Sequence, residues 1–176
     1  TFMVLAPEHE LVGKITPGPY KERVDSYVKW AKNRSERERI AEVDRITGEF
    51  TGAYGINPLN GEKLPIWIAD YVLITYGTGA IMAVPAHDER DFEFAKKFEL
   101  TILKVILAEN DQIESELKEA YTGDGKMINS GKYTEMDSGK GAVLISEDLE
   151  KQKLGKRTIQ YKLRDWLVSR QRYWGA

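Results

Sequence analysis

The stretch that most constrains this chain is residues 77–95, which read GTGAIMAVPAHDERDFEFA. An uninterrupted apolar run lies there between a Gly-Thr-Gly sequence and Pro85. A short apolar run with glycine and proline at its ends is typical of a strand that is buried on both faces. We therefore predict a buried strand over residues 80–84 that stops at the proline.

A helix is expected directly after this strand. Asp88 suits the N-cap position, and Asp91 stands three residues later, where a capping box places its acidic residue. Phe92 and Ala95 then begin an apolar face at helical spacing. Two interpretations remain open: the acids only cap the helix, or they join His87 in a functional site at the strand end.

Four segments, in order along the chain, resemble the editing domain that is inserted into leucyl-tRNA synthetases of bacterial or organellar type. The resemblance implies a mixed α/β fold with a β-barrel core ringed by helices. It also implies that 1–162 is the editing domain without its N-terminal threonine-rich strand, and that 163–176 returns toward the synthetic domain. The segments are Thr1–Leu11 (TFMVLAPEHEL), Ala53–Phe98 (from AYGINP to DFEFAKKF), Ala120–Gly131 (AYTGDGKMINSG) and Leu163–Gly175 (LRDWLVSRQRYWG).

The resemblance implies a role for each matching residue of the site. Asp91 is expected to receive the α-ammonium group of the misattached amino acid, since a fixed carboxylate is a natural partner for a cation. His87 and Asp88 would form the adjacent polar wall, and Met82 and Val84 the apolar lining around the amino-acid side chain. For these two apolar residues, ordinary core packing is the alternative. The flanking strand is expected to contain Tyr76, Gly77 and Thr78.

The implied reaction is hydrolysis of a wrong aminoacyl ester on tRNA-Leu. A binding pocket rejects a one-methylene difference by only about 1–3 kcal/mol, so a second, hydrolytic site raises fidelity. The chain has no cysteine and no serine in a nucleophile-elbow motif, which leaves attack by a positioned water. With two histidines and no cysteine, no metal site is expected.

The expected partners are the acceptor end of tRNA-Leu, a misattached norvaline, isoleucine or methionine, and the rest of the synthetase. No cofactor is expected in this domain, whereas the parent enzyme would use ATP and Mg. No apolar run is long enough to cross a membrane, and the absence of cysteine suits the cytoplasm. The formal net charge of −2 gives no overall attraction to nucleic acid.

Alternatives remain at the level of function. An isoleucyl- or valyl-type editing domain shares a related barrel, and a non-catalytic RNA-binding module would only guide the tRNA acceptor end. In the family, the threonine-rich strand that should precede Thr1 supplies hydroxyl groups near the ester. We therefore expect weak or no deacylation from residues 1–176 alone.

The remaining elements are predicted from local patterns. A helix is expected over residues 20–43, with its charged part, 32–39, in solvent or near RNA. Basic and aromatic residues alternate from Lys151 onward, which suits either a phosphate backbone or a solvated edge beside a neighbouring domain. Further predictions are a hairpin around 57–61, strands over 66–74 and 101–108, and a helix over 146–154 capped by Ser146.

Overall fold

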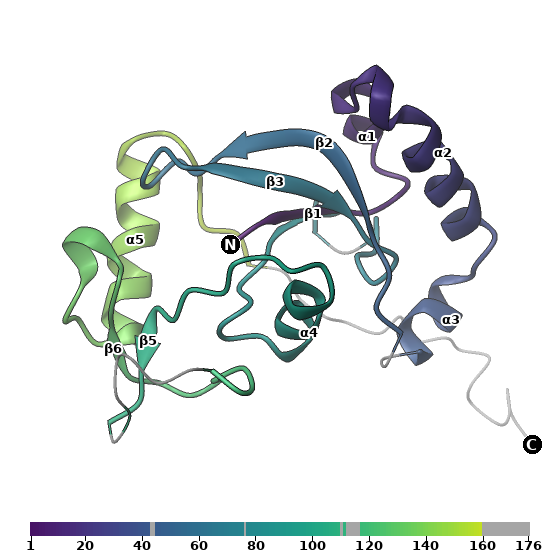
Figure 1. Ribbon diagram of the computed structural model, residues 1–176. Helices are drawn as coiled ribbons and strands as arrows, with labels where there is room; N and C mark the ends of the chain where they lie inside the picture. Colours follow the sequence, from purple (N-terminus) through teal and green to yellow (C-terminus); the bar gives the residue numbers. More distant parts are fainter. Residues whose placement is uncertain (43–44, 76, 110, 112–116, 160–176) are drawn as a thin grey trace, which may run out of the picture.

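A four-stranded sheet forms the centre of the protein in a computed structural model that describes residues 1–42, 45–75, 77–109, 111 and 117–159 (Figure 1). The strands lie in the order β2-β3-β1-β4. β1 is parallel to β3 and antiparallel to β4, and β2 and β3 form an antiparallel pair. The strands are β1 (Met3–Leu5), β2 (Glu49–Ile56), β3 (Lys63–Ile68) and β4 (Ala80–Met82).

One face of the sheet is covered at only one end. Helices α1 (Glu10–Ile15) and α2 (Gly18–Lys32) pack there against Leu5 and Ile68. At the other end of the same face Met3 pairs with Met82, whose side chain is 47% exposed. The prediction of a strand buried on both faces was therefore wrong, because no helix among the described residues covers this end.

The opposite face carries the main core, against which helix α4 (Glu89–Lys97) packs. Phe94 of α4 stacks on Phe2 with ring centroids 5.2 Å apart, and it meets Trp67 of β3 edge to face at 5.6 Å. Burying such large rings dominates the energetics of a core of this size. The amphipathic helix predicted after Pro85 is thereby confirmed.

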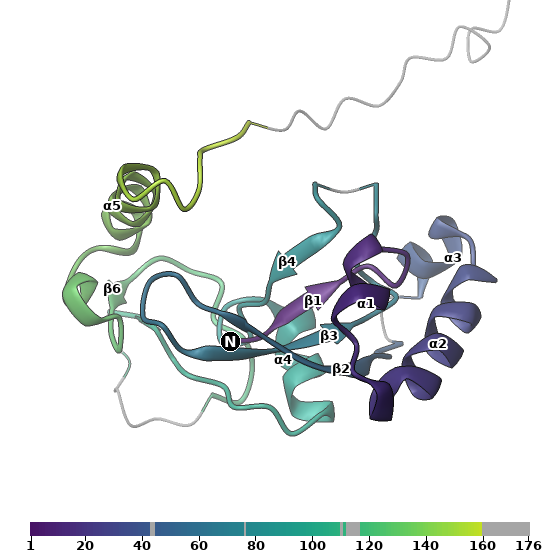
Figure 2. The same ribbon diagram turned by 90° about the horizontal axis from the view of Figure 1, so that it is seen from above.

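A smaller unit lies at the end of the sheet away from α1 and α2 (Figures 1 and 2). Strands β5 (Ile106–Leu107) and β6 (Lys126–Met127) pair there, followed by the short 3-10 helix η1 (Gly131–Tyr133). Helix α5 (Ser138–Lys151) packs on β6, where Gly141 allows close approach because a Cβ atom would collide with Met127. The helix predicted from Ser146 was placed too late, since Asp137 caps α5.

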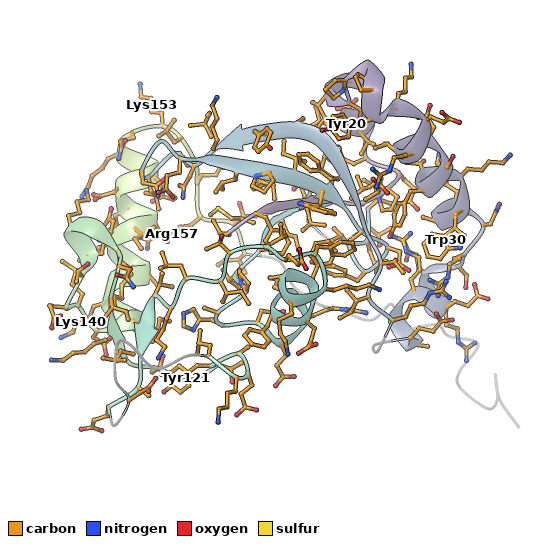
Figure 3. The ribbon with its side chains drawn as sticks, in the orientation of Figure 1. Tyr20, Trp30, Tyr121, Lys140, Lys153 and Arg157 are labelled. Atoms are coloured by element: carbon orange, nitrogen blue, oxygen red, sulfur yellow. The ribbon has the colours of Figure 1, made fainter. Side chains whose placement is uncertain are left out.

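The helix predicted over 20–43 is two helices. α2 ends at Lys32, and α3 (Glu36–Ala41) begins after Ser35, which forms a capping box with Glu38. The charged part is not simply solvated, because Arg39 is 4% exposed and binds Glu8 at 2.7 Å. The guanidinium of Arg34, in the same charged part, lies 5.1 Å over the ring of Trp30, which is labelled in Figure 3.

The strands predicted over 66–74 and 101–108 are shorter in the structure. In the first range β3 ends at Ile68, and in the second only β5 is paired. The fold is mixed α/β, as expected, while the described strands form open sheets rather than a closed barrel. No helix in the described part of the chain is long and apolar enough to cross a membrane. The return segment 163–176 lies outside the described residues.

Candidate functional site

The start of α4 is built around Asp88. Its Oδ1 accepts hydrogen bonds from the amides of Arg90 and Asp91, both at 3.0 Å, which confirms it as the N-cap. The carbonyl of Val84 accepts from the amides of His87 and Asp88, so a tight turn joins β4 to the helix. This turn brings the acids of the first helical turn back to the end of the strand.

Asp91 does not complete a capping box. Its Oδ2 accepts from the amide of Val84 at 2.8 Å, and its Oδ1 accepts from the hydroxyl of Tyr71 at 2.9 Å. The residue is only 5% exposed. Burial raises the pKa of this carboxyl, while the hydrogen bonds from Val84 and Tyr71 act in the opposite direction. The carboxylate therefore joins three segments: α4, the end of β4 and the loop after β3.

Met82 and Val84 are at the surface rather than in the core. Their side chains are 47% and 50% exposed, which rules out ordinary core packing as their role. Met82 lies beside Met3 on the open end of the sheet face, and the backbone of Val84 is directly bonded to Asp91. The exposed Val84 side chain thus belongs to the residue whose amide binds the buried carboxylate.

His87 is bonded to backbone groups through both ring nitrogens. Its Nε2 accepts from the amides of Val105 and Ile106 at 3.3 and 3.2 Å, so Nδ1 carries the proton and donates to the carbonyl of Tyr121 at 2.8 Å. Tyr121 (labelled in Figure 3) stands in the segment before β6. His87 thereby ties the site to the smaller sheet, and its predicted place at the ester stays a prediction.

Gly77 and Thr78 form an exposed turn before β4, not the flanking strand that was expected. The turn needs left-handed backbone at Gly77 (φ 63°) and Gly79 (φ 70°), which residues with a side chain rarely adopt. The amide of Ala6 donates to the carbonyl of Gly79 at 2.8 Å and anchors the turn to β1. Tyr76 lies outside the described residues.

A cavity of about 530 Å³ opens on another side of α4. The predicted site residues do not contribute to its lining, which consists of Glu89, Phe92, Glu93, Glu119, Ala120, Tyr121, Thr122 and Gly123. Within the described ranges no group of three or more histidine or acidic side chains is arranged to hold a metal ion.

The basic segment after α5 is described only as far as residue 159. Lys153 lies near the end of α5, and Arg157 lies alongside the helix (Figure 3). Arg157 forms ion pairs with Glu147 at 3.5 Å and Glu150 at 3.8 Å, so part of the basic charge is balanced by the helix itself. The remaining basic residues of this segment, Lys162, Arg164, Arg170 and Arg172, lie outside the described residues.

Comparison with known proteins defines the class of domain. The sequence model of the family "Leucyl-tRNA synthetase, editing domain" matches residues 1–150, and the chain belongs to this family. It is 56% identical over 176 residues to the leucine–tRNA ligase of Clostridium tetani and 52% identical over 177 residues to that of Petrotoga mobilis. These matches favour the leucyl type over the isoleucyl or valyl type.

Both matches include the whole of the present chain, which spans only 21% of the length of each of these relatives. A solved structure of a leucyl-tRNA synthetase is also similar to this chain. The crystal structure of the ternary complex of Agrobacterium radiobacter K84 LeuRS with tRNA and LeuAMS aligns with a TM-score of 0.64 and 27% sequence identity. This match covers 93% of the present chain and 17% of the other.

Proposed function

We propose that this domain hydrolyses the ester of mischarged aminoacyl-tRNA-Leu after transfer, with Asp91 receiving the α-ammonium group. The observation that carries the proposal is the Asp91 carboxylate, which is held by the Tyr71 hydroxyl and by the amide of Val84, a residue whose own side chain is exposed. A carboxylate has about four acceptor sites, so its two hydrogen bonds leave acceptor sites that an ammonium donor can use. A cation that arrives there also favours the ionised form, against the effect of burial.

The substrate side chain would lie on the apolar surface formed by Met82 and Val84. A norvaline, isoleucine or methionine side chain gains by leaving water on such a surface. The bond that breaks is the ester between the amino acid and the tRNA, and water supplies the attacking oxygen. Holding the ester and water in one geometry is the main contribution expected of the protein.

His87 and Asp88 would act in this reaction by shaping the wall beside the ester. His87 is bonded to backbone groups beside the smaller sheet through both ring nitrogens, and Asp88 is bonded to the first turn of α4 through Oδ1. A rigid wall supports a precisely oriented substrate. The glycine turn at Gly77 and Thr78 borders β4, and with Tyr76 it would complete the substrate side of the site.

Several wider features belong to the same proposal. The tRNA acceptor end and the rest of the synthetase are the expected partners in the cytoplasm, and ATP and Mg would act elsewhere in that enzyme. The family barrel would need further strands, for which β4 offers a free edge in the described order β2-β3-β1-β4.

The test is deacylation of isoleucyl- and norvalyl-tRNA-Leu by a longer synthetase that contains residues 1–176. We expect Asp91→Asn to lower kcat/KM at least tenfold, which corresponds to about 1.4 kcal/mol of lost transition-state binding. Glu93→Gln is the matched control, because this side chain is on the same helix and 54% exposed. Full activity of Asp91→Asn would refute the proposal, and tRNA binding without hydrolysis in the unmodified protein would favour the RNA-binding module.

A further inference from the structure

Tyr71 is the residue of this site that no sequence pattern indicated. It stands in the loop after β3, and its hydroxyl donates to Oδ1 of Asp91 at 2.9 Å. The guanidinium of Arg90 lies 5.0 Å over the Tyr71 ring, and the ring meets Phe94 at 5.9 Å. These two contacts hold the ring, and the hydroxyl is directed at the carboxylate.

The loop that carries Tyr71 is fixed by buried ionic contacts. The residue before it, Asp70, binds Arg34 at 2.5 Å through Oδ2 and Thr47 at 2.7 Å through Oδ1. The residue after it, Val72, accepts a hydrogen bond from Arg39 at 2.8 Å through its carbonyl. Since both neighbours are anchored, the position of the Tyr71 hydroxyl is determined by the fold and not by local flexibility.

We propose that Tyr71 is a positioning residue of the deacylation reaction, which holds Oδ1 of Asp91 in the orientation that receives the ammonium group. This inference rests on the proposed function. Tyr71 itself is not required to touch the substrate. It acts through Asp91, together with the amide of Val84 on the other oxygen.

The arrangement gives the Tyr71 hydroxyl a definite electrostatic effect. A hydrogen bond donated to a carboxylate favours its ionised form, and this bond lowers the pKa of Asp91 against the raising effect of burial. The Tyr71 hydroxyl remains a donor, because burial and the nearby Asp91 charge raise its own pKa above the ordinary value. Removing the hydroxyl should therefore raise the pKa of Asp91.

The experiment is the pH profile of kcat/KM for deacylation of isoleucyl-tRNA-Leu by the longer synthetase. We expect Tyr71→Phe to move the acidic limb to higher pH by at least about half a unit, with activity recovered at higher pH. Tyr133→Phe is the matched control: its hydroxyl donates to Asp148 at 2.8 Å, another tyrosine–aspartate bond placed on η1 and α5. The control should keep the limb of the unmodified enzyme.

A second variant keeps the test decisive if Tyr71→Phe folds poorly. Replacing Tyr71 by 3-fluorotyrosine retains the ring and makes the hydroxyl a stronger donor, so the limb should move to lower pH. An unchanged limb in both variants would overturn the role of Tyr71. If Asp91→Asn retains full activity, the proposed function fails instead, whatever the result at Tyr71.

Discussion

The amide of Val84 donates a hydrogen bond of 2.8 Å to Oδ2 of Asp91, so the end of β4 and the first turn of α4 share one buried carboxylate. A carboxylate in the first turn of a helix is favoured by the helix dipole. Here it also satisfies a strand-end amide that would otherwise lack a partner. The hydrogen bond therefore stabilises the fold and also fixes the position of the Asp91 carboxylate, which we propose to act in the reaction.

The first prediction concerns the pH dependence of stability. Burial raises the pKa of Asp91 in the folded state above its unfolded value, so folding favours the neutral form. This contribution is fully present below about pH 4, near the unfolded pKa, and is lost as pH rises through the folded pKa. The stability of the unmodified protein relative to Asp91→Asn should therefore fall as the pH rises from about 4 through the folded-state pKa of Asp91, as measured by urea unfolding.

Glu93→Gln provides the reference for this experiment, since its side chain is 54% exposed and forms a surface ion pair with Lys96, a kind of contact that contributes little to stability. A relative stability that stays level or increases with pH across the same range would contradict the prediction.

The second prediction treats His87 as a structural link. In His87→Ala the amides of Val105 and Ile106 lose their acceptor and the carbonyl of Tyr121 loses its donor. We expect a loss of about 1–3 kcal/mol in the free energy of unfolding and faster hydrogen exchange at both amides.

His9→Ala is the comparison for His87→Ala, because His9 uses Nδ1 only to cap α1 at the amide of Leu11, at the surface. It should leave exchange at Val105 and Ile106 unchanged. Equal exchange rates at these amides in His87→Ala and the unmodified protein would show that His87 does not hold the smaller sheet.

The third prediction separates an exposed methionine from a buried one. Met82→Ala should cost less than about 1 kcal/mol, because the side chain is 47% exposed. Met127→Ala should cost about 2–5 kcal/mol, because Met127 is 9% exposed and packs on Gly141. Urea unfolding measures both values, and similar costs would mean that Met82 is a core residue.

If Met82 lines the substrate site, Met82→Ala should also change the ratio of the deacylation rates for norvalyl- and isoleucyl-tRNA-Leu. An unchanged ratio would remove Met82 from the proposed lining.

The fourth prediction addresses the buried charge of α3. Arg39 binds Glu8 at 2.7 Å and donates to the carbonyl of Val72 at 2.8 Å. Arg39→Met leaves these partners without a donor and should destabilise the protein by about 3–5 kcal/mol in thermal or urea unfolding. Arg37→Met, at an exposed position on the same helix, should change stability by less than about 0.5 kcal/mol. Equal stabilities of the two variants would refute a structural role for Arg39.

Features that depend on neighbours in the chain were predictable from the sequence. The N-cap at Asp88, the amphipathic α4 and the strand before Pro85 follow from residues within a few positions of one another. The ordered motifs likewise predicted the family, which the comparison confirms. Such patterns involve residues that are close in the chain, so a single sequence is enough to predict the elements that they form.

The contacts that define the site depend on distant segments, which only the tertiary structure brings together. Tyr71 meets Asp91 across 20 positions, and His87 meets the amide of Val105 across 18. Arg39 is buried because Glu8 and Val72 surround it, although its own neighbours in the sequence are charged. The periodicity of a sequence indicates which face of an element is apolar, whereas tertiary packing decides which end of that face is covered. No helix among the described residues packs over the end that contains Met82, so this side chain is 47% exposed.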